Sequence, residues 1–148
     1  MDVMPSDDVI GAWVRLMRAQ HSALSKVEAA IKNAGLPQLS WYDVLLELGR
    51  AGDKGLRPFE LERELLLPQY GLSRLLDRIE QAGFVERRPC EEDARGHAVC
   101  ITKSGKAMRR RMWPVYARAI QDAVGAHLSA RDAKRLSELL GKLYERRG

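Results

Sequence analysis

The sequence predicts a mainly α-helical fold that carries one small β-hairpin. Apolar residues recur at helical spacing in long segments near both ends of the chain and in shorter segments between them. Two β-prone runs, 84–90 and 97–102, flank a polar, acidic connection that contains glycine. The 148 residues, of which 45% are hydrophobic, are enough for a single domain with a sizeable core.

The first helix is expected to follow Ser6, which would cap an acidic first turn formed by Asp7 and Asp8, and to stop at Gly35 and Pro37. Its large apolar residues keep roughly helical spacing: Val9, Trp13, Leu16, Leu24, Val27 and Ile31. This is more apolar surface than a small domain needs. Part of the helix is therefore expected to meet another subunit.

The second helix is expected to begin with Ser40 as its cap and Asp43 as the carboxylate of a capping box. Leu39 and Val44 are placed to form a hydrophobic staple around this start. A group of glycines marks the end of the helix: Gly49, Gly52 and Gly55.

A short helix and a longer one, separated by a tight turn, are predicted next. Leu56 and Arg57 are expected to be extended and to pair with the hairpin, because the residue before a proline is biased to β geometry. Pro58 opens the short helix, and Pro68 is expected in the first turn of the longer one. Gly83 can end that helix in the left-handed conformation. This arrangement is typical of a helix-turn-helix.

The longer helix has an apolar stripe and a polar face. The stripe consists of Leu72, Leu75, Leu76 and Ile79. The polar face consists of Ser73, Arg74, Asp77, Arg78 and Gln81. Arginines beside short hydrogen-bonding side chains suit the floor of a DNA major groove, where arginine binds guanine and glutamine binds adenine. A solvated charged face is the alternative.

The hairpin favours the DNA hypothesis, because Arg95 stands near the tip of its connection. A polar-faced helix followed at once by such a hairpin has the outline of a winged helix-turn-helix, which we assign to residues 37–103. Cys90 is expected opposite His97 and Cys100 opposite Arg87. That offset is too large for a disulfide, which disfavours redox sensing.

After the hairpin, Thr102 or Ser104 is expected to cap a long helix that Pro114 kinks, and Ser129 with Asp132 forms a further capping box. The terminal helix has one apolar face, made of Leu136, Leu139, Leu140, Leu143 and Tyr144. Residues 1–36 and 104–148 are therefore expected to pack together as a helical dimerisation region. Helical DNA-binding proteins commonly dimerise to span two half-sites.

Composition restricts the function. A formal net charge of +5 and a pI near 9.5 are compatible with a polyanionic partner. No apolar run reaches the roughly 18 residues of a membrane span, and the acidic N-terminus is unlike a signal peptide, so a cytoplasmic location is expected. The sequence shows no metal-ligand spacing, phosphate loop or nucleophile–base pair. No metal or cofactor is expected, and an enzyme is disfavoured.

The chain resembles the MarR family of bacterial transcriptional regulators over nearly its whole length. The matching stretches are LSWYDVLLELGRAG, LRPFELERELLLPQYGLSRLLDRIEQAGFVERRPC, EDARG and ITKSGKAM. The resemblance implies a dimer with interlocked terminal helices, a palindromic operator, and repression relieved by a small phenolic or otherwise aromatic ligand or by cysteine oxidation. Oxidation-sensing members carry a reactive cysteine near the start of the chain, whereas this chain has none before Cys90.

The resemblance also implies roles for individual residues. Ser73-Arg74 and Arg78 correspond to the Ser-Arg pair and the second arginine of the recognition helix. Asp93-Ala94-Arg95 corresponds to the Asp-x-Arg of the wing. The arginine is expected in the minor groove. Asp93 is expected to pair with Arg95 or with a recognition-helix arginine and so to hold it for DNA.

The candidate DNA-contacting residues are Gln69, Tyr70, Ser73, Arg74, Arg78, Arg88, Asp93 and Arg95. Gln69 and Tyr70 are expected at the N-terminal end of the recognition helix, where base contacts concentrate. Arg57 and Arg88 are candidates for phosphate contacts, with plain surface charges as the alternative. Double-stranded DNA is thus the expected partner.

An effector pocket, by resemblance, lies between the dimer helices and the DNA-binding lobe. The candidates to line it are Trp13, His21, Trp41, Tyr42, Trp113 and Tyr116. Plain core is the alternative for each aromatic residue, and His21 or Arg50 could offer charge to an anionic ligand.

The sequence therefore predicts a homodimeric, sequence-specific transcriptional regulator, a repressor rather than an activator, released from a palindromic operator by a small aromatic or phenolic ligand. Two rival hypotheses remain. One is a winged-helix interaction module without DNA binding, which retention of Arg74 and Arg95 disfavours. The other is a small enzyme or ligand carrier, which the lack of a catalytic constellation disfavours.

Overall fold

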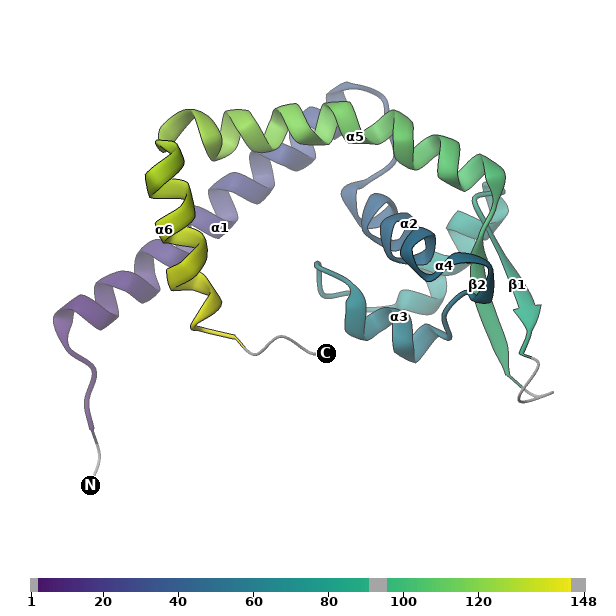
Figure 1. The fold of residues 1–148 in the computed structure, drawn as a ribbon, viewed down its shortest axis with the longest axis horizontal. Helices are drawn as coiled ribbons and strands as arrows, with labels where there is room; N and C mark the ends of the chain where they lie inside the picture. Colours follow the sequence, from purple (N-terminus) through teal and green to yellow (C-terminus); the bar gives the residue numbers. More distant parts are fainter. Residues whose placement is uncertain (1–2, 91–95, 145–148) are drawn as a thin grey trace.

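The computed structural model describes residues 3–90 and 96–144, which form a helical molecule with one β-hairpin (Figure 1). The elements in chain order are α1 (Asp7–Asn33), α2 (Leu39–Ala51), the 3₁₀ turn η1 (Gly52–Lys54), α3 (Pro58–Glu64), α4 (Leu72–Gln81), β1 (Val85–Pro89), β2 (His97–Ile101), α5 (Lys103–Ala123), the 3₁₀ turn η2 (Gly125–His127) and α6 (Ala130–Gly141). The predicted fold class, mainly α with a small β wing, is confirmed.

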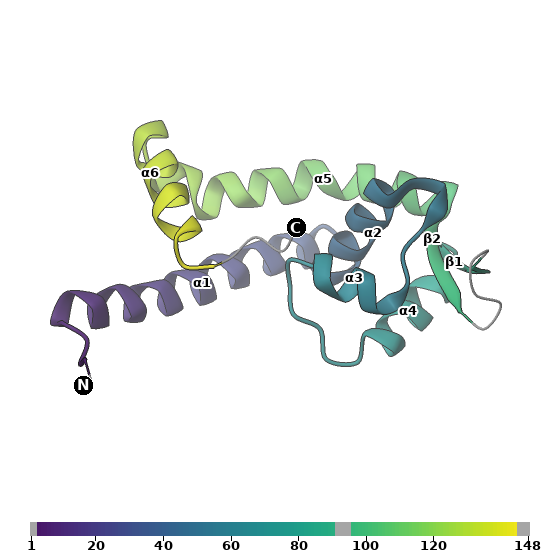
Figure 2. The same ribbon diagram turned by 60° about the horizontal axis from the view of Figure 1, so that its bottom comes forward.

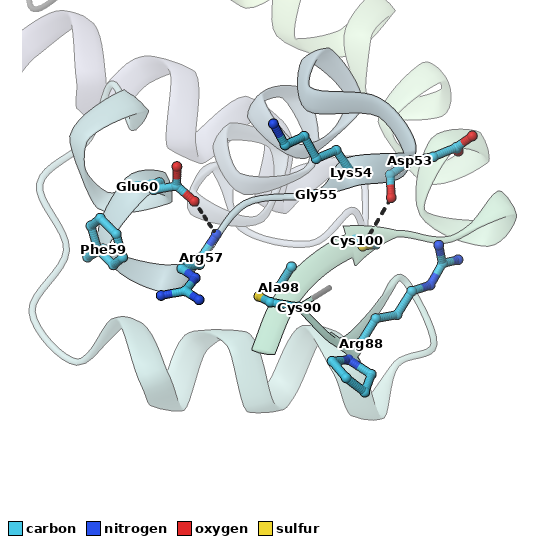
Figure 3. A pocket seen from close by; sticks show the side chains of 11 residues that line it. Asp53, Lys54, Gly55, Arg57, Phe59, Glu60, Arg88, Cys90, Ala98 and Cys100 are labelled. Atoms are coloured by element: carbon cyan, nitrogen blue, oxygen red, sulfur yellow. Dashed lines mark hydrogen bonds between the residues drawn. The ribbon is translucent and has the colours of Figure 1, made fainter. Parts of the chain in front are cut away.

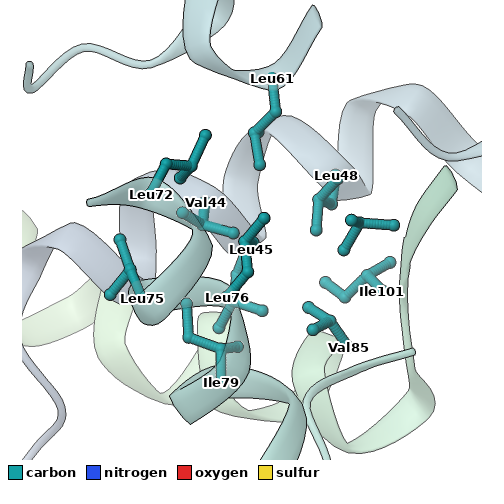
Figure 4. Packing of buried hydrophobic residues seen from close by; sticks show 11 residues of the cluster. Val44, Leu45, Leu48, Leu61, Leu72, Leu75, Leu76, Ile79, Val85 and Ile101 are labelled. Atoms are coloured by element: carbon teal, nitrogen blue, oxygen red, sulfur yellow. The ribbon is translucent and has the colours of Figure 1, made fainter. Parts of the chain in front are cut away.

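One apolar core holds α2, α3, α4 and the hairpin together as a lobe (Figure 4). The whole predicted stripe of α4 is buried in this core: Leu72, Leu75, Leu76 and Ile79. Leu45 of α2, Leu61 of α3 and Val85 of β1 belong to the same cluster. Because the stripe faces inward, the opposite side of α4 must face outward.

A second core joins this lobe to the long helices. Val27 and Ile31 of α1, Tyr42 of α2 and Met112 of α5 are buried in it. Figures 1 and 2 both show α5 running beside the second half of α1, and the two helices are in contact. Since α2 contributes to both cores, it links the lobe to the α1–α5 pair.

The first half of α1 and all of α6 present apolar side chains to solvent. Trp13 of α1 is 62% exposed, and Val9 and Ile10 are exposed beside it. No residue of α6 is buried. The exposed apolar residues in and just after α6 are Leu136, Leu139, Leu143 and Tyr144. A single chain thus leaves uncovered the surface that the sequence assigns to another subunit.

Most helix boundaries lie where the sequence signals place them. These signals are Ser6 as the cap of α1, Pro58 at the start of α3, Gly83 with φ +84° after α4, Thr102 as the cap of α5, and the capping box of Ser129 and Asp132 at α6. The predicted pairing of the chain before Pro58 with the hairpin is also present, as a bridge between Leu56 and Val99. Pro114 lies inside α5, which continues to Ala123.

The start of α2 differs from the prediction. The helix begins at Leu39 with Gln38 as its N-cap, so Ser40 is not the cap. Gly49, expected among the terminating residues, lies inside the helix, which runs to Ala51. Leu39, which was expected to precede the helix as a staple residue, is its first residue. The first turn therefore begins earlier in the chain than predicted.

The capping box predicted around Asp43 is also wrong. Because α2 starts before Ser40, Asp43 lies beyond the third helical position from which a carboxylate reaches back to the cap. Its side chain is buried instead, and its carboxylate accepts hydrogen bonds from the backbone amides of Leu66 and Leu67.

The start of α4 is also later than predicted. Pro68 was expected in its first turn, but the helix begins at Leu72, after Gly71 with φ +77°. Residues 65–71 form a connection longer than the predicted tight turn. Gln69 and Tyr70 therefore precede the helix and do not form part of it.

The register of the hairpin differs by one residue from the prediction. Cys100 pairs with Glu86, and the amide of Cys90 donates to the carbonyl of Gly96 just beyond the strand ends. A shift of one residue moves side chains to the other face of a hairpin. The alternation of side chains along a strand fixes the register only where one face is buried. The connection between these two strands is polar, so its sequence does not fix the register.

Candidate nucleic-acid interface

The outward face of α4 carries the polar side chains predicted from its sequence. Ser73, Arg74 and Arg78 are all exposed, while Leu76 and Ile79 on the other side of the helix are buried. The helix is therefore held from behind by packing, and its arginines project from a rigid support. Such a helix can enter a major groove without rearrangement of the lobe.

A hollow of about 400 Å³ opens at the N-terminal end of α4. It is lined by Gln38, Ser40, Gln69, Tyr70, Gly71, Arg74, Leu75 and Arg78. Tyr70 is 100% exposed, which is unusual for a large aromatic side chain. The structure thus brings four predicted contact residues, Gln69, Tyr70, Arg74 and Arg78, to one place.

Two residues of this hollow, Gln38 and Ser40, were not predicted as contact residues. They stand at the start of α2, the helix that lies before α3 in the lobe. Ser40 was interpreted only as a helix cap, and Gln38 was given no role. The proximity of the start of α2 to the start of α4 depends on tertiary packing, so local sequence patterns do not show it.

The base of the wing carries Arg88, whose exposed guanidinium donates to the carboxylate of Glu86 on the same strand. The two other predicted wing residues, Asp93 and Arg95, lie outside the described residues. Arg57 lies close to the end of the hairpin, because a Cβ on Gly96 would meet its Nη2 at 2.6 Å.

Arg87, the preceding residue of β1, is oriented differently. Its Nη2 lies 2.9 Å from Oδ1 of Asp77, and its Nη1 lies 2.5 Å from Oε1 of Glu80. Both carboxylates belong to α4, so this one guanidinium ties the wing strand to the helix. This role of Arg87 was not predicted from the sequence, although the alternation of β1 places Arg87 on the same face as the buried Val85.

Asp43 fixes the connection that leads into α4. Its Oδ1 accepts from the amide of Leu66 at 3.1 Å, and its Oδ2 accepts from the amide of Leu67 at 2.8 Å. Burial raises the pKa of the Asp43 carboxyl above its usual value, and the two backbone amides partly oppose this shift. The residue is only 5% exposed. It is the one buried acidic side chain among the described residues.

The predicted effector residues are only partly brought together. Tyr42, Trp113 and Tyr116 form one aromatic cluster, with ring centroids 5.0 to 6.2 Å apart. Trp41 points to the lobe core instead and packs edge-on against Phe84, with centroids 6.0 Å apart. Trp13 and His21 lie on exposed positions of α1.

A cavity of about 680 Å³ adjoins this aromatic cluster, between the lobe, α5 and Tyr144. Its wall includes Tyr42, Asp43, Arg50, Arg63, Leu67 and Tyr116. Burial raises the pKa of the Tyr116 hydroxyl above its usual value. The cavity therefore offers aromatic surface and a protonated phenol. Its charged side chains include Arg63, Glu64 and the pair of Arg50 with Glu47, in which Nη1 lies 2.9 Å from Oε1.

Another cavity, of about 880 Å³, lies between η1, the start of α3 and the hairpin (Figure 3). Cys90 and Cys100 both line it and both are free thiols. The Cys100 thiol is buried and donates to the carbonyl of Asp53, with a distance of 3.7 Å between sulfur and oxygen. Burial raises the pKa of this thiol, which makes it a poor nucleophile at neutral pH.

Within residues 3–90 and 96–144, no group of three or more His, Cys, Asp or Glu side chains is placed to hold a metal ion. None of the helices in this part of the chain is long and apolar enough to cross a membrane.

Comparison with known proteins shows a resemblance to one family. The family model described as "MarR family" matches residues 34–96, which contain the hollow, α4 and the base of the wing. This segment of the chain is similar to the MarR family. Members of this family are transcriptional regulators, which supports the expectation that the chain is a regulator and not an enzyme.

Two relatives match more of the chain than residues 34–96. PecS of Dickeya dadantii, an HTH-type transcriptional regulator, is 29% identical over 136 residues, which cover 91% of this chain and 79% of PecS. YetL of Bacillus subtilis, an HTH-type transcriptional repressor, is 31% identical over 105 residues, which cover 71% of this chain and 62% of YetL.

Solved structures of MarR proteins have the same fold. Sco3205 of Streptomyces coelicolor, a MarR family regulator crystallised in complex with DNA, superposes with a TM-score of 0.83 at 24% identity, covering 97% of this chain and 89% of Sco3205. The superposition includes the terminal helices as well as the lobe. The winged helix-turn-helix fold of the MarR family is thereby confirmed for this chain.

Proposed function

We propose that this protein is a homodimeric repressor of the MarR type that binds a palindromic operator and leaves it when a small aromatic or phenolic ligand binds. The observation that carries the proposal is the outward face of α4, where Arg74 and Arg78 border the hollow that also contains Gln69 and Tyr70. Sco3205 was crystallised with DNA and YetL is named a repressor, which supports the proposal by likeness. A cytoplasmic location follows from this function.

The DNA contacts divide by chemistry. Ser73, Arg74 and Arg78 enter the major groove, where an arginine can donate two hydrogen bonds to guanine. Gln69 and Tyr70 contact bases or phosphates at the entrance to the groove, and Arg88 contacts phosphate. Asp93 and Arg95 act at the wing tip, with Arg95 in the minor groove.

The dimer forms through residues 1–36 and 104–148, where a single chain leaves apolar side chains of α1 and α6 exposed. Exposed Trp13 on α1 and exposed Leu139 and Leu143 at α6 support this assignment, because monomeric proteins rarely expose large contiguous apolar patches. A two-fold dimer places two copies of α4 on one side, and such dimers bind half-sites roughly 34–36 Å apart.

The ligand occupies the cavity beside Tyr42 and Tyr116, with Arg50 or Arg63 as the partner for an anionic group. Aromatic walls with a few polar groups are typical of small-molecule sites. Asp43 lines the same cavity and holds the connection into α4, so ligand binding there can change the position of that helix. Trp113 supports the site by packing on both tyrosines.

Selection of bound sequences from random duplex DNA tests the DNA-binding part of the proposal. We expect a palindrome with two half-sites about one helical turn apart. An Arg74→Ala/Arg78→Ala double variant is the matched control, and it should recover no consensus. No enrichment with the unchanged protein would contradict the proposal and favour a winged-helix interaction module.

The ligand part is tested separately on the recovered operator. Salicylate serves as a probe that is both phenolic and anionic, and Tyr42→Ala and Arg50→Ala variants should need more of it to release DNA. Release that is unaffected by these substitutions would place the ligand elsewhere.

A further inference from the structure

We propose that Arg87 is a positioning residue for DNA binding, which fixes the wing strand to α4 and neutralises the carboxylates that α4 would otherwise present to DNA. This inference rests on the proposed function, because it concerns how α4 meets the phosphates. It adds a residue outside the predicted set of DNA contacts.

The geometry of the Arg87 side chain supports a clamp. Its two terminal nitrogens bind Asp77 at 2.9 Å and Glu80 at 2.5 Å. These acids stand three positions apart in α4 and so lie on the same side of the helix, one turn apart. A planar guanidinium with donors in a fixed fork can bind both at once, which a lysine could not do in the same way.

The backbone around Arg87 is fixed as well. It pairs with Val99 of β2 in the hairpin, and Val99 is in turn bridged to Leu56. The neighbouring inward residue of β1, Val85, is buried in the lobe core. The guanidinium therefore starts from a rigid strand, and its contacts set the distance and angle between the wing and α4.

The charges on α4 explain why such a clamp would serve DNA binding. Asp77 stands on the polar face between Arg74 and Arg78, the two arginines proposed to enter the major groove. An unpaired carboxylate there would repel phosphates and weaken the arginines. When Asp77 is paired with Arg87, its carboxylate keeps a fixed position, and the guanidinium charge offsets most of its negative potential.

A purely structural role for Arg87 is the competing explanation. The side chain of Arg87 is 28% exposed and those of Asp77 and Glu80 are 57% and 39% exposed. Ion pairs that remain open to solvent contribute little to folding stability. Removal of Arg87 should therefore leave the melting temperature nearly unchanged. The effect should appear in DNA binding.

The test is a mutant cycle on the operator recovered by selection, with full-length protein and a series of salt concentrations. The proteins are the unchanged chain, Arg87→Ala, Asp77→Asn/Glu80→Gln, and the variant with all three changes. We expect Arg87→Ala to lose about tenfold in affinity at low salt, because two uncompensated acids then face the DNA. The variant with all three changes should recover most of that loss.

Three results would overturn the proposal. A loss that persists in the variant with all three changes, together with a salt slope lowered by about one, would mean that Arg87 itself contacts a phosphate. A changed base preference in Asp77→Asn/Glu80→Gln would mean that one of the two acids contacts a base. A loss of thermal stability that matches the loss of affinity would mean a structural role. If the unchanged chain selects no DNA at all, the proposed function itself is contradicted. If the chain does bind DNA and the effects of Arg87→Ala and of the two acid substitutions simply add, only the role of Arg87 is contradicted.

Discussion

Asp43 and Leu67 stand 24 residues apart in the chain, and the amide of Leu67 donates a 2.8 Å hydrogen bond to the buried carboxylate of Asp43. This bond joins the middle of α2 to the connection that leads into α4. In the same connection, Leu66 donates to the other carboxylate oxygen. The position of the proposed DNA-binding helix therefore depends on one acidic side chain outside that helix.

Replacing Asp43 should destabilise the fold. Asp43→Ala removes the acceptor of two backbone amides, and hydrogen bonds to charged groups are worth about 1.5–3 kcal/mol each. We expect a loss of about 2 kcal/mol in the free energy of unfolding, measured by urea denaturation, since part of the cost of burying the charge is recovered. Asp43→Asn keeps one acceptor oxygen and should lose less. Equal stability of all three proteins would show that the two bonds do not hold the connection.

The same residue predicts a pH dependence. The pKa of Asp43 in the folded chain lies above its ordinary value of 3.8, mainly because burial disfavours the charged form. Between these two pKa values the folded chain binds more protons than the unfolded one. The contribution of Asp43 to stability should therefore fall as the pH rises from 3.8 through the folded pKa, and stay constant above it. The difference in unfolding free energy between the unchanged protein and Asp43→Asn, measured across this range, checks the sign. A difference that rises with pH would mean that the amides outweigh the burial.

The recognition arginines predict a sequence-dependent loss of affinity. If Arg74 binds a guanine, Arg74→Ala should cost about 1–3 kcal/mol on the selected operator and less on random DNA. The same holds for Arg78. Fluorescence anisotropy with both duplexes measures the difference, and Arg131→Ala on the exposed surface of α6 is a matched control for the lost charge. An equal loss on every duplex would mean a phosphate contact.

Much of this interface could be predicted from local sequence patterns. The stripe of α4 has helical spacing, so the burial of Leu76 and the exposure of Arg74 follow from periodicity alone. Thr102 and Pro58 mark helix starts by local chemistry. These signals need only neighbours in the sequence.

The parts that could not be predicted depend on partners distant in the sequence. Asp43 stands where a capping box was plausible, and only the position of Leu67 in the folded chain shows its other role. Trp41 and Tyr42 are adjacent, yet successive helical residues point in different directions, so Trp41 enters the lobe core and Tyr42 the second core. A sequence pattern marks both as apolar without assigning them to different cores.

The exposed leucines of α6 predict that one charge can separate the dimer. Leu139→Asp places a carboxylate on the exposed apolar face, where a partner subunit would have to bury it, and burying an unpaired charge costs several kcal/mol. We expect sedimentation to show a shift toward monomer at micromolar concentration. Lys134→Asp puts the same acid on the opposite, polar side of α6 and should leave the dimer intact. Dissociation by both variants, or by neither, would contradict a dimer formed through this face.

Two glycines provide a paired test of how the lobe is packed behind the wing. Gly55 has φ +69°, and a Cβ there would lie 2.5 Å from both Sγ of Cys100 and the carbonyl oxygen of Val99 (Figure 3 shows Gly55 beside Cys100). Gly55→Ala combines backbone strain with overpacking against the strand, and should cost about 2–4 kcal/mol in unfolding free energy.

Gly49 is the matched control, because it lies inside α2 and a Cβ there meets nothing within 4 Å. Gly49→Ala should raise stability by about 0.5–1 kcal/mol, since alanine loses less backbone entropy in a helix. Urea denaturation of both variants separates the two effects of the same substitution. Equal stability of Gly55→Ala and the unchanged protein would contradict the close approach of η1 to β2, which fixes the base of the wing.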